Sequence, residues 1–203
     1  MKKILFTLTL LISAVSFGQK LSELEKRADI LYNSDDFYGS ISVLNEIIEI
    51  DSQYAIDNRI YYQRGTAKQI LQDYEGALSD FNIEVPPMFA DLQWRKGLCY
   101  YNLGNYQKAI DYQNKALELY NEYVDAYYYR GLSKWKLNDY YGAISDFTKV
   151  IELEDDTYNV GAYRMRGVSK EKIGDLNGAC ADWKKASRLG DADAAEWVAN
   201  QCN

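Results

Sequence analysis

The sequence predicts an all-α protein made of repeated helical hairpins, and two observations support this fold class. First, a small residue recurs twelve positions before a second one, in the pairs Gly65/Ala77, Gly97/Ala109, Gly131/Ala143 and Gly167/Ala179. Glycine inside an apolar helical pattern costs about 1 kcal/mol relative to alanine, so its recurrence indicates that a side chain is not tolerated there. Small residues on two antiparallel helices let those helices approach closely.

Second, a turn lies between the two members of each pair. It combines a residue that tolerates the left-handed conformation with an Asp or Asn that can cap the next helix, as in Asn138-Asp139. A degenerate first copy around Ala28 and Ser40 has the same arrangement. The cap positions are Asp36, Asp73, Asn105, Asp139 and Asp175.

A further regularity carries a family resemblance. An aromatic residue follows three of the four alanines by four positions, and successive copies are 32 to 37 residues apart. This pattern resembles the tetratricopeptide repeat, a helical hairpin of about 34 residues. In the third copy, Gln113 stands in place of the aromatic, and the proline that usually ends a repeat occurs only at Pro86-Pro87. The resemblance implies a right-handed superhelical solenoid of about five hairpins, at about residues 21–54, 58–87, 90–123, 124–157 and 160–190, closed by a capping helix at 191–203.

The connections and ends of the array follow from the same alignment. Residues 51–57 are predicted as a polar connection, and the second copy is predicted to end at Pro86-Pro87 because proline cannot continue a helix. We expect one continuous solenoid, because each repeat of such an array contacts its neighbours.

The N-terminus has the pattern of a secretory signal peptide over residues 1–18. A pair of lysines precedes an apolar run from Ile4 to Phe17, and cleavage is expected before Gln19. A membrane anchor is the alternative, but this run is shorter than the stretch of about 20 residues that spans a bilayer. We therefore expect an exported protein, periplasmic or secreted, that does not span the membrane.

Composition excludes several classes of function. The formal net charge is -7 and basic residues do not cluster, which argues against nucleic-acid binding. The chain has no histidine, so histidine-dependent triads and the commonest metal ligand are absent. The acidic run 152–156 could be a weak calcium site, but a solvated loop between repeats is favoured because no ligand loop surrounds it. No cofactor or metal is expected.

Three copies share a pair of opposite charges. An Arg just before the Gly is followed sixteen positions later by an Asp, in Arg64/Asp80, Arg130/Asp146 and Arg166/Asp182. The third copy changes both members, to Lys96 and Tyr112. Because the two helices of a hairpin run antiparallel, the pattern predicts bidentate salt bridges within these repeats; unrelated surface charges are the alternative.

The chain has three cysteines. Cys180 lies in the last predicted repeat and Cys202 near the end of the predicted capping helix. Cysteine pairs tend to become disulfides in an oxidising compartment, and this closing segment resembles that of exported bacterial tetratricopeptide proteins, in which two such cysteines recur. A Cys180–Cys202 disulfide is therefore predicted. Cys99 is expected to be a buried small hydrophobe.

The resemblance also implies a function. Tetratricopeptide arrays bind extended peptides or helices of partner proteins in a concave groove lined by the first helix of each hairpin. We expect a non-enzymatic interaction scaffold of the bacterial envelope, and not a binder of chaperone tails, because Glu25 and Asp29 replace the basic pattern of that branch. By register the groove residues are Arg59, Tyr62, Trp94, Leu98, Tyr101, Tyr128, Leu132, Trp135, Arg164 and Val168.

Other assignments remain open at this stage. Some of these rings could pack between neighbouring repeats rather than line a groove. An aromatic groove can also stack sugars, so a carbohydrate- or peptidoglycan-associated protein is the alternative, and an enzyme with paired carboxylates is a weaker one. Self-association into a homo-oligomer is a third alternative.

Overall fold

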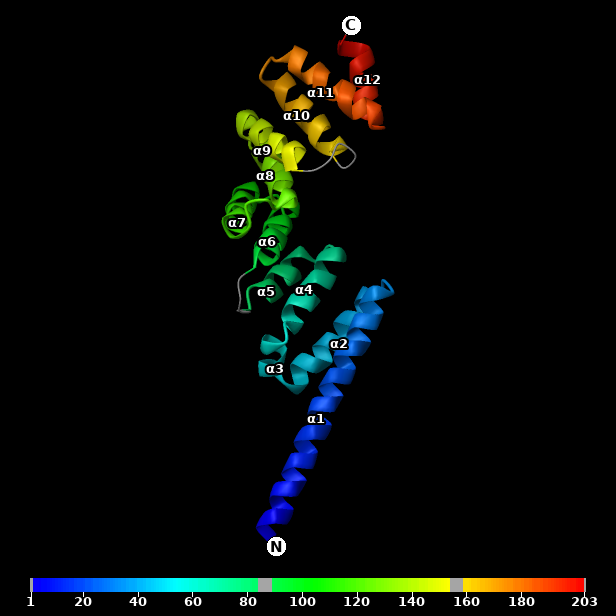
Figure 1. Cartoon of the computed structure of the whole chain (residues 1–203), viewed down its shortest axis with the longest axis vertical. Helices are drawn as coiled ribbons and strands as arrows, with labels where there is room; N and C mark the ends of the chain where they lie inside the picture. The colour runs from blue at the N-terminus through cyan, green and yellow to red at the C-terminus, as the bar shows by residue number, and fades with distance from the viewer. Residues whose placement is uncertain (1, 84–88, 154–158, 203) are drawn as a thin grey trace. The chain divides into compact units, whose positions relative to one another are not determined.

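A computed structural model describes residues 2–83, 89–153 and 159–202, with side chains from residue 17 onward. The described residues form twelve α-helices and no strand (Figure 1). The helices group into two compact units, residues 1–87 and 88–203. That these units form one continuous array stays a prediction from the sequence.

The first unit contains five helices. Its long first helix continues from the predicted signal segment into the first hairpin without a break. An apolar core that includes Leu21, Leu44, Ile47 and Ile60 holds the hairpins together. The helices are α1 (Lys2–Asn33), α2 (Phe37–Ile50), α3 (Ser52–Asp57), α4 (Ile60–Ile70) and α5 (Tyr74–Phe81).

The second unit contains three hairpins and a final helix, which covers the end of the array as predicted. In each hairpin the two helices lie side by side and run in opposite directions (Figure 1). The helices are α6 (Ala90–Asn102), α7 (Tyr106–Leu119), α8 (Val124–Lys136), α9 (Tyr140–Leu153), α10 (Val160–Lys172), α11 (Leu176–Arg188) and α12 (Ala192–Gln201).

The turns inside the hairpins have the predicted chemistry. Asn138 takes a left-handed φ of 64°, and the carboxylate of Asp139 then accepts a hydrogen bond of 2.9 Å from the Gly142 N–H. The other turns repeat this geometry, with positive φ at Asp35, Gln72, Gly104 and Gly174. Each turn thus ends one helix and caps the next.

The recurring glycines lie where the helices of a hairpin touch. A Cβ atom at Gly131 would lie 3.0 Å from the Phe147 ring, so the ring occupies the space that a side chain would need. Phe147 and Ala143 are fully buried. The prediction of close approach is confirmed.

The predicted polar connection at residues 51–57 is wrong. This segment forms helix α3, because the Asp51 carboxylate accepts a hydrogen bond of 2.9 Å from the Tyr54 N–H and caps it. Ala55 is fully buried and Tyr54 packs against the same apolar core. Helix α3 is stable because the apolar core of the first unit covers the face that carries Ala55.

The predicted end of the second copy, at Pro86-Pro87, is not tested by the described residues. Helix α5 ends at Phe81 and has 8 residues, whereas α7 and α9 have 14 each. Pro86-Pro87 and most of the acidic run 152–156 lie outside the described residues. The division between the two units falls after Pro87.

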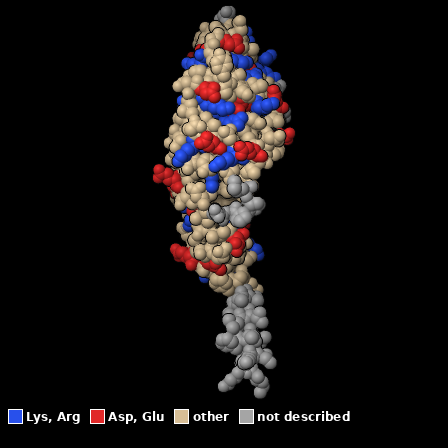
Figure 2. Space-filling view, turned by 90° about the vertical axis from the view of Figure 1, so that its left-hand side faces the viewer, with Lys and Arg blue, Asp and Glu red and all other residues tan. Residues whose placement is uncertain are grey.

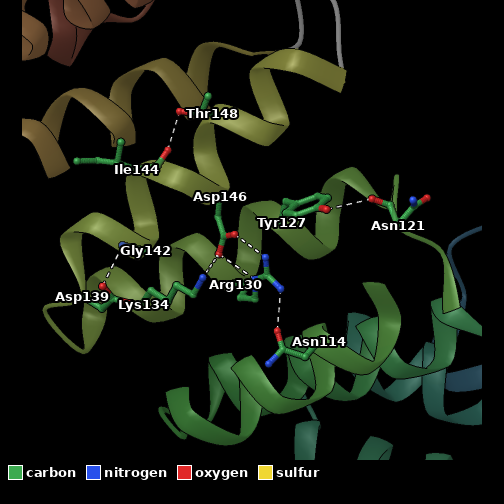
Figure 3. A network of polar contacts seen from close by, with 10 residues as sticks. All are labelled: Asn114, Asn121, Tyr127, Arg130, Lys134, Asp139, Gly142, Ile144, Asp146 and Thr148. Atoms are coloured by element: carbon green, nitrogen blue, oxygen red, sulfur yellow. Dashed lines mark hydrogen bonds and ion pairs between the residues drawn. The ribbon is translucent and has the colours of Figure 1, made fainter. Parts of the chain in front are cut away.

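The predicted salt bridges are confirmed, and each is part of a network of more than two residues. Arg130 donates from Nε and Nη2 to the two carboxylate oxygens of Asp146, at 2.9 and 2.6 Å (Figure 3). Lys134, one turn further along α8, lies 2.8 Å from the same carboxylate, and the third guanidinium nitrogen donates to Asn114 on α7 at 2.7 Å. Equivalent networks join Arg64, Lys68 and Asp80, and Arg166, Lys170 and Asp182.

Candidate functional site

The face of the second unit that the first helix of each hairpin lines is rich in aromatic rings. Tyr129 is at its centre: its ring centroid lies 6.4 Å from Trp94, 5.6 Å from Tyr101 and 5.6 Å from Tyr128. Trp94 also packs on Tyr123 at 5.8 Å. These rings are half-buried and join neighbouring hairpins, so they stiffen this face as well as line it.

Burial sets the ionisation of these phenols. It raises the pKa of Tyr101 and Tyr128 above the ordinary value for tyrosine. The pKa of Tyr123 is raised further, by burial first and then by the Asp91 carboxylate, to which its hydroxyl donates a hydrogen bond of 3.1 Å. At neutral pH this face therefore presents neutral rings.

A cavity of about 420 Å³ opens at the C-terminal end of this face. Four helices contribute to its walls, which are mainly apolar with a charged edge. Ligand pockets have volumes of about 300–1,000 Å³ and a similar lining. Its residues are Trp135, Met165, Val168, Glu171, Lys172, Trp183, Trp197 and Gln201.

Helix α12 forms one wall of this cavity and is held at both ends. At its start, Arg164 of α10 lies 3.2 Å from Asp191 and 3.3 Å from Asp193. At its end, the structure places the sulfurs of Cys180 and Cys202 2.02 Å apart, with Cα atoms 5.5 Å apart. Trp197 between these ends packs on the buried Trp183 at 5.2 Å, so the wall has a defined position.

Comparisons with known proteins identify the repeats in this unit. Family models described as tetratricopeptide repeats match residues 90–123 and residues 124–157. These two segments are tetratricopeptide repeats. A tetratricopeptide repeat-containing protein of Methanocaldococcus jannaschii is 24% identical over 123 residues, which make up 60% of this chain and 21% of that protein. The chain thus spans about a fifth of the length of this relative.

Solved structures show the same fold. MamA of Desulfovibrio magneticus, solved from its residue 41 to its end, is 19% identical with a TM-score of 0.76, over 84% of this chain and 94% of the solved chain. YrrB, described as a TPR protein with an unusual peptide-binding site, is 20% identical with a TM-score of 0.75, over 91% of this chain and 97% of its own. The first TPR of RPAP3, bound to an HSP90 peptide, is 23% identical with a TM-score of 0.52, over 56% and 90%. At these identities the likeness establishes a solenoid of tetratricopeptide-type hairpins.

The structure divides the predicted groove residues between the two units. Arg59 and Tyr62 belong to the first unit: Arg59 is exposed at the N-cap of α4 with a φ of 60°, and Tyr62 packs on Phe81 at 6.0 Å. The other eight are partly buried residues of the repeats in the second unit, and two of them, Trp135 and Val168, line the cavity. That these residues contact a partner stays a prediction.

Several residues of this face were missed by sequence reasoning. Tyr129 and Met165 directly follow the predicted residues Tyr128 and Arg164, so the helical register of the repeats could have found them. Trp197 gave no such signal, because it belongs to the final helix, outside any repeat. Among the described residues, no group of three or more His, Cys, Asp or Glu side chains is placed to hold a metal ion.

Proposed function

We propose that this protein is a non-enzymatic interaction scaffold that binds a segment of a partner protein along the aromatic face of its second unit. The observation that carries the proposal is the cavity lined by Trp135, Val168 and Trp197, among others. Its apolar walls suit one bulky aliphatic or aromatic side chain, and the rings of Trp94, Tyr101 and their neighbours suit the rest of an extended segment. YrrB and the RPAP3 repeat, which share the fold, are peptide-binding proteins by description.

The cavity gives this binding mode its specificity. An anchor side chain gains affinity when it is fully desolvated in a well-packed pocket. Glu171 and Lys172 at the edge of the cavity can bind backbone or polar groups that flank the anchor. Because walls from α8, α10 and α12 all contribute, the cavity exists only when the last repeat and the final helix are docked.

The proposal includes export and an oxidised cysteine pair. The signal pattern at residues 1–18 supports export to the periplasm or beyond, and an oxidising compartment would convert Cys180 and Cys202 into a disulfide that fixes α12. Among the described residues, no helix is both long and apolar enough to cross a membrane.

Selection from a random peptide library on the purified protein tests the proposed function. We expect selected peptides to share a bulky apolar residue and to lose about 30-fold in affinity when Trp135 is replaced by alanine. The matched control is Tyr141→Ala, which removes a 73% exposed ring from α9 outside the cavity. If both variants bind the selected peptides as the original protein does, the cavity is not the binding site.

A further inference from the structure

The third hairpin lacks the carboxylate that the second, fourth and fifth hairpins hold between their helices. Where those hairpins have Arg, Lys and Asp, it has Lys96, Tyr100 and Tyr112. The Tyr100 and Tyr112 rings stack with centroids 5.3 Å apart and planes inclined by 15°. An aromatic pair thus occupies the register positions of a buried ion network.

Three lysines surround this aromatic pair. The Lys115 and Lys96 ammonium groups lie 4.6 and 5.9 Å from the centroid of the Tyr112 ring, and Lys108 lies 5.1 Å from that of Tyr100. We name Lys96, Tyr100, Lys108, Tyr112 and Lys115 the third-hairpin basic site. Cation–π contacts hold the lysines in place without neutralising their charge.

No described carboxylate forms a salt bridge with these lysines. Asp111 is one helical turn from both Lys108 and Lys115, but its carboxylate accepts a hydrogen bond of 3.2 Å from Gln107. The pKa of Lys96 is lowered, by burial first and then by repulsion from the Lys115 ammonium group. The site therefore concentrates positive charge on a chain whose net charge is -7.

The site is accessible to a ligand. Lys108 and Lys115 are exposed, and Lys96 and the two tyrosines are partly exposed. On the face drawn in Figure 2, basic and acidic side chains alternate instead of gathering in one basic area. A compact set of three ammonium groups suits one or two anions rather than a polyphosphate backbone, which needs an extended row of cations.

We propose that the third-hairpin basic site binds carboxylate side chains from an acidic segment of a partner protein. Asp80, Asp146 and Asp182 occupy the equivalent position in the other three hairpins, and this recurrence indicates a carboxylate as the ligand. In the third hairpin the acceptor comes from the partner. This proposal does not depend on the groove, since none of the five residues lines the cavity.

Fluorescence anisotropy with a labelled peptide of alternating Glu and Ser tests the site, with a Gln-for-Glu peptide as the probe control. The decisive variant is the triple substitution Lys96→Arg, Tyr100→Lys and Tyr112→Asp, which installs the ion network of the other hairpins. It adds one positive and one negative charge, so the net charge does not change. Lys184→Gln, at an exposed position of α11, controls for the loss of a remote lysine.

We expect the purified protein to bind the Glu peptide about 10- to 100-fold more tightly than the Gln peptide at low salt, since three ion pairs at exposed or partly exposed lysines each contribute a few-fold. The triple variant should lose this preference and Lys184→Gln should keep it. Equal binding of the two peptides, or an unchanged preference in the triple variant, would overturn the proposal. The proposal would also be overturned if inorganic polyphosphate displaced the labelled Glu peptide more effectively than unlabelled Glu peptide does, with the two competitors compared at equal concentrations of negative charge. If the triple variant fails to fold, the exposed pair Lys108→Gln and Lys115→Gln decides by the same criteria.

Discussion

Replacing Asp146 with alanine should lower the free energy of unfolding of the second unit by about 2–4 kcal/mol. Asp146 is 2% exposed and is the common acceptor for Arg130 and Lys134. Removing one partner of a fully buried ion pair costs about 3–5 kcal/mol, because the remaining charge is left without compensation. Here the side chains of Arg130 and Lys134 are 17% and 20% exposed, so water can solvate them in the variant and the loss is smaller.

Urea unfolding followed by tryptophan fluorescence measures this loss where it occurs. All four tryptophans lie at positions 94 to 197, within the second unit, so the signal reports on that unit. The matched control is Glu152→Ala, which removes the acid of an ion pair of 2.6 Å whose partners are 52–53% exposed. That pair should contribute about 0–1 kcal/mol. If the urea midpoint of Asp146→Ala lies as close to that of the original protein as the midpoint of Glu152→Ala does, the buried network does not contribute the expected stability.

Three further predictions concern the second unit. Gln113→Phe should stabilise it by about 1–2 kcal/mol in urea unfolding, since the buried Gln113 Oε1 has no described hydrogen-bond partner. Cys202→Ser should lower stability by about 3 kcal/mol if Cys180 and Cys202 form a disulfide closing a loop of 22 residues, and alkylation without reductant should then modify neither cysteine. Because the pKa of Tyr123 is higher in the folded protein than in the unfolded chain, its contribution to stability is complete below about pH 10 and is lost as the pH rises towards the pKa in the folded state. Spectrophotometric titration should show one tyrosine that ionises at higher pH than the others, and Tyr123→Phe should remove it.

The hairpins could be predicted because their determinants are local. Each turn needs a left-handed residue followed by a capping Asp or Asn, and each helix contact needs a small residue, so the spacing of these residues appears directly in the sequence. Helix α3 was missed because its signal, Asp51 as a cap and Ala55 as a buried contact, depends on a surface that other helices provide. The division after Pro87 is likewise a property of tertiary contacts.

The site was predicted only in outline for a related physical reason. Register places Trp94, Tyr101 and Tyr128 on the first helix of their hairpins, but the same position can face a groove or the next hairpin. The structure shows that Trp94 and Tyr101 pack across hairpins, on Tyr129 of α8. The cavity requires Trp197 from α12, whose docking depends on Arg164 and on the cysteine pair at the end of the chain.

Among the described residues, an ion network is present only in hairpins that follow another hairpin of the same unit. In every network the arginine also donates to a side chain on the second helix of the hairpin before it, at 2.6 Å to Asn45, 2.7 Å to Asn114 and 3.1 Å to Thr148. The first hairpin of each unit has no preceding hairpin within that unit, and neither holds the acid: Val43 and Tyr112 stand in its place. A guanidinium that binds two helices at once is useful only between stacked hairpins, because its fork needs acceptors on both sides. The network therefore joins repeats to one another, and its absence at α6 leaves Lys96 without an internal acid.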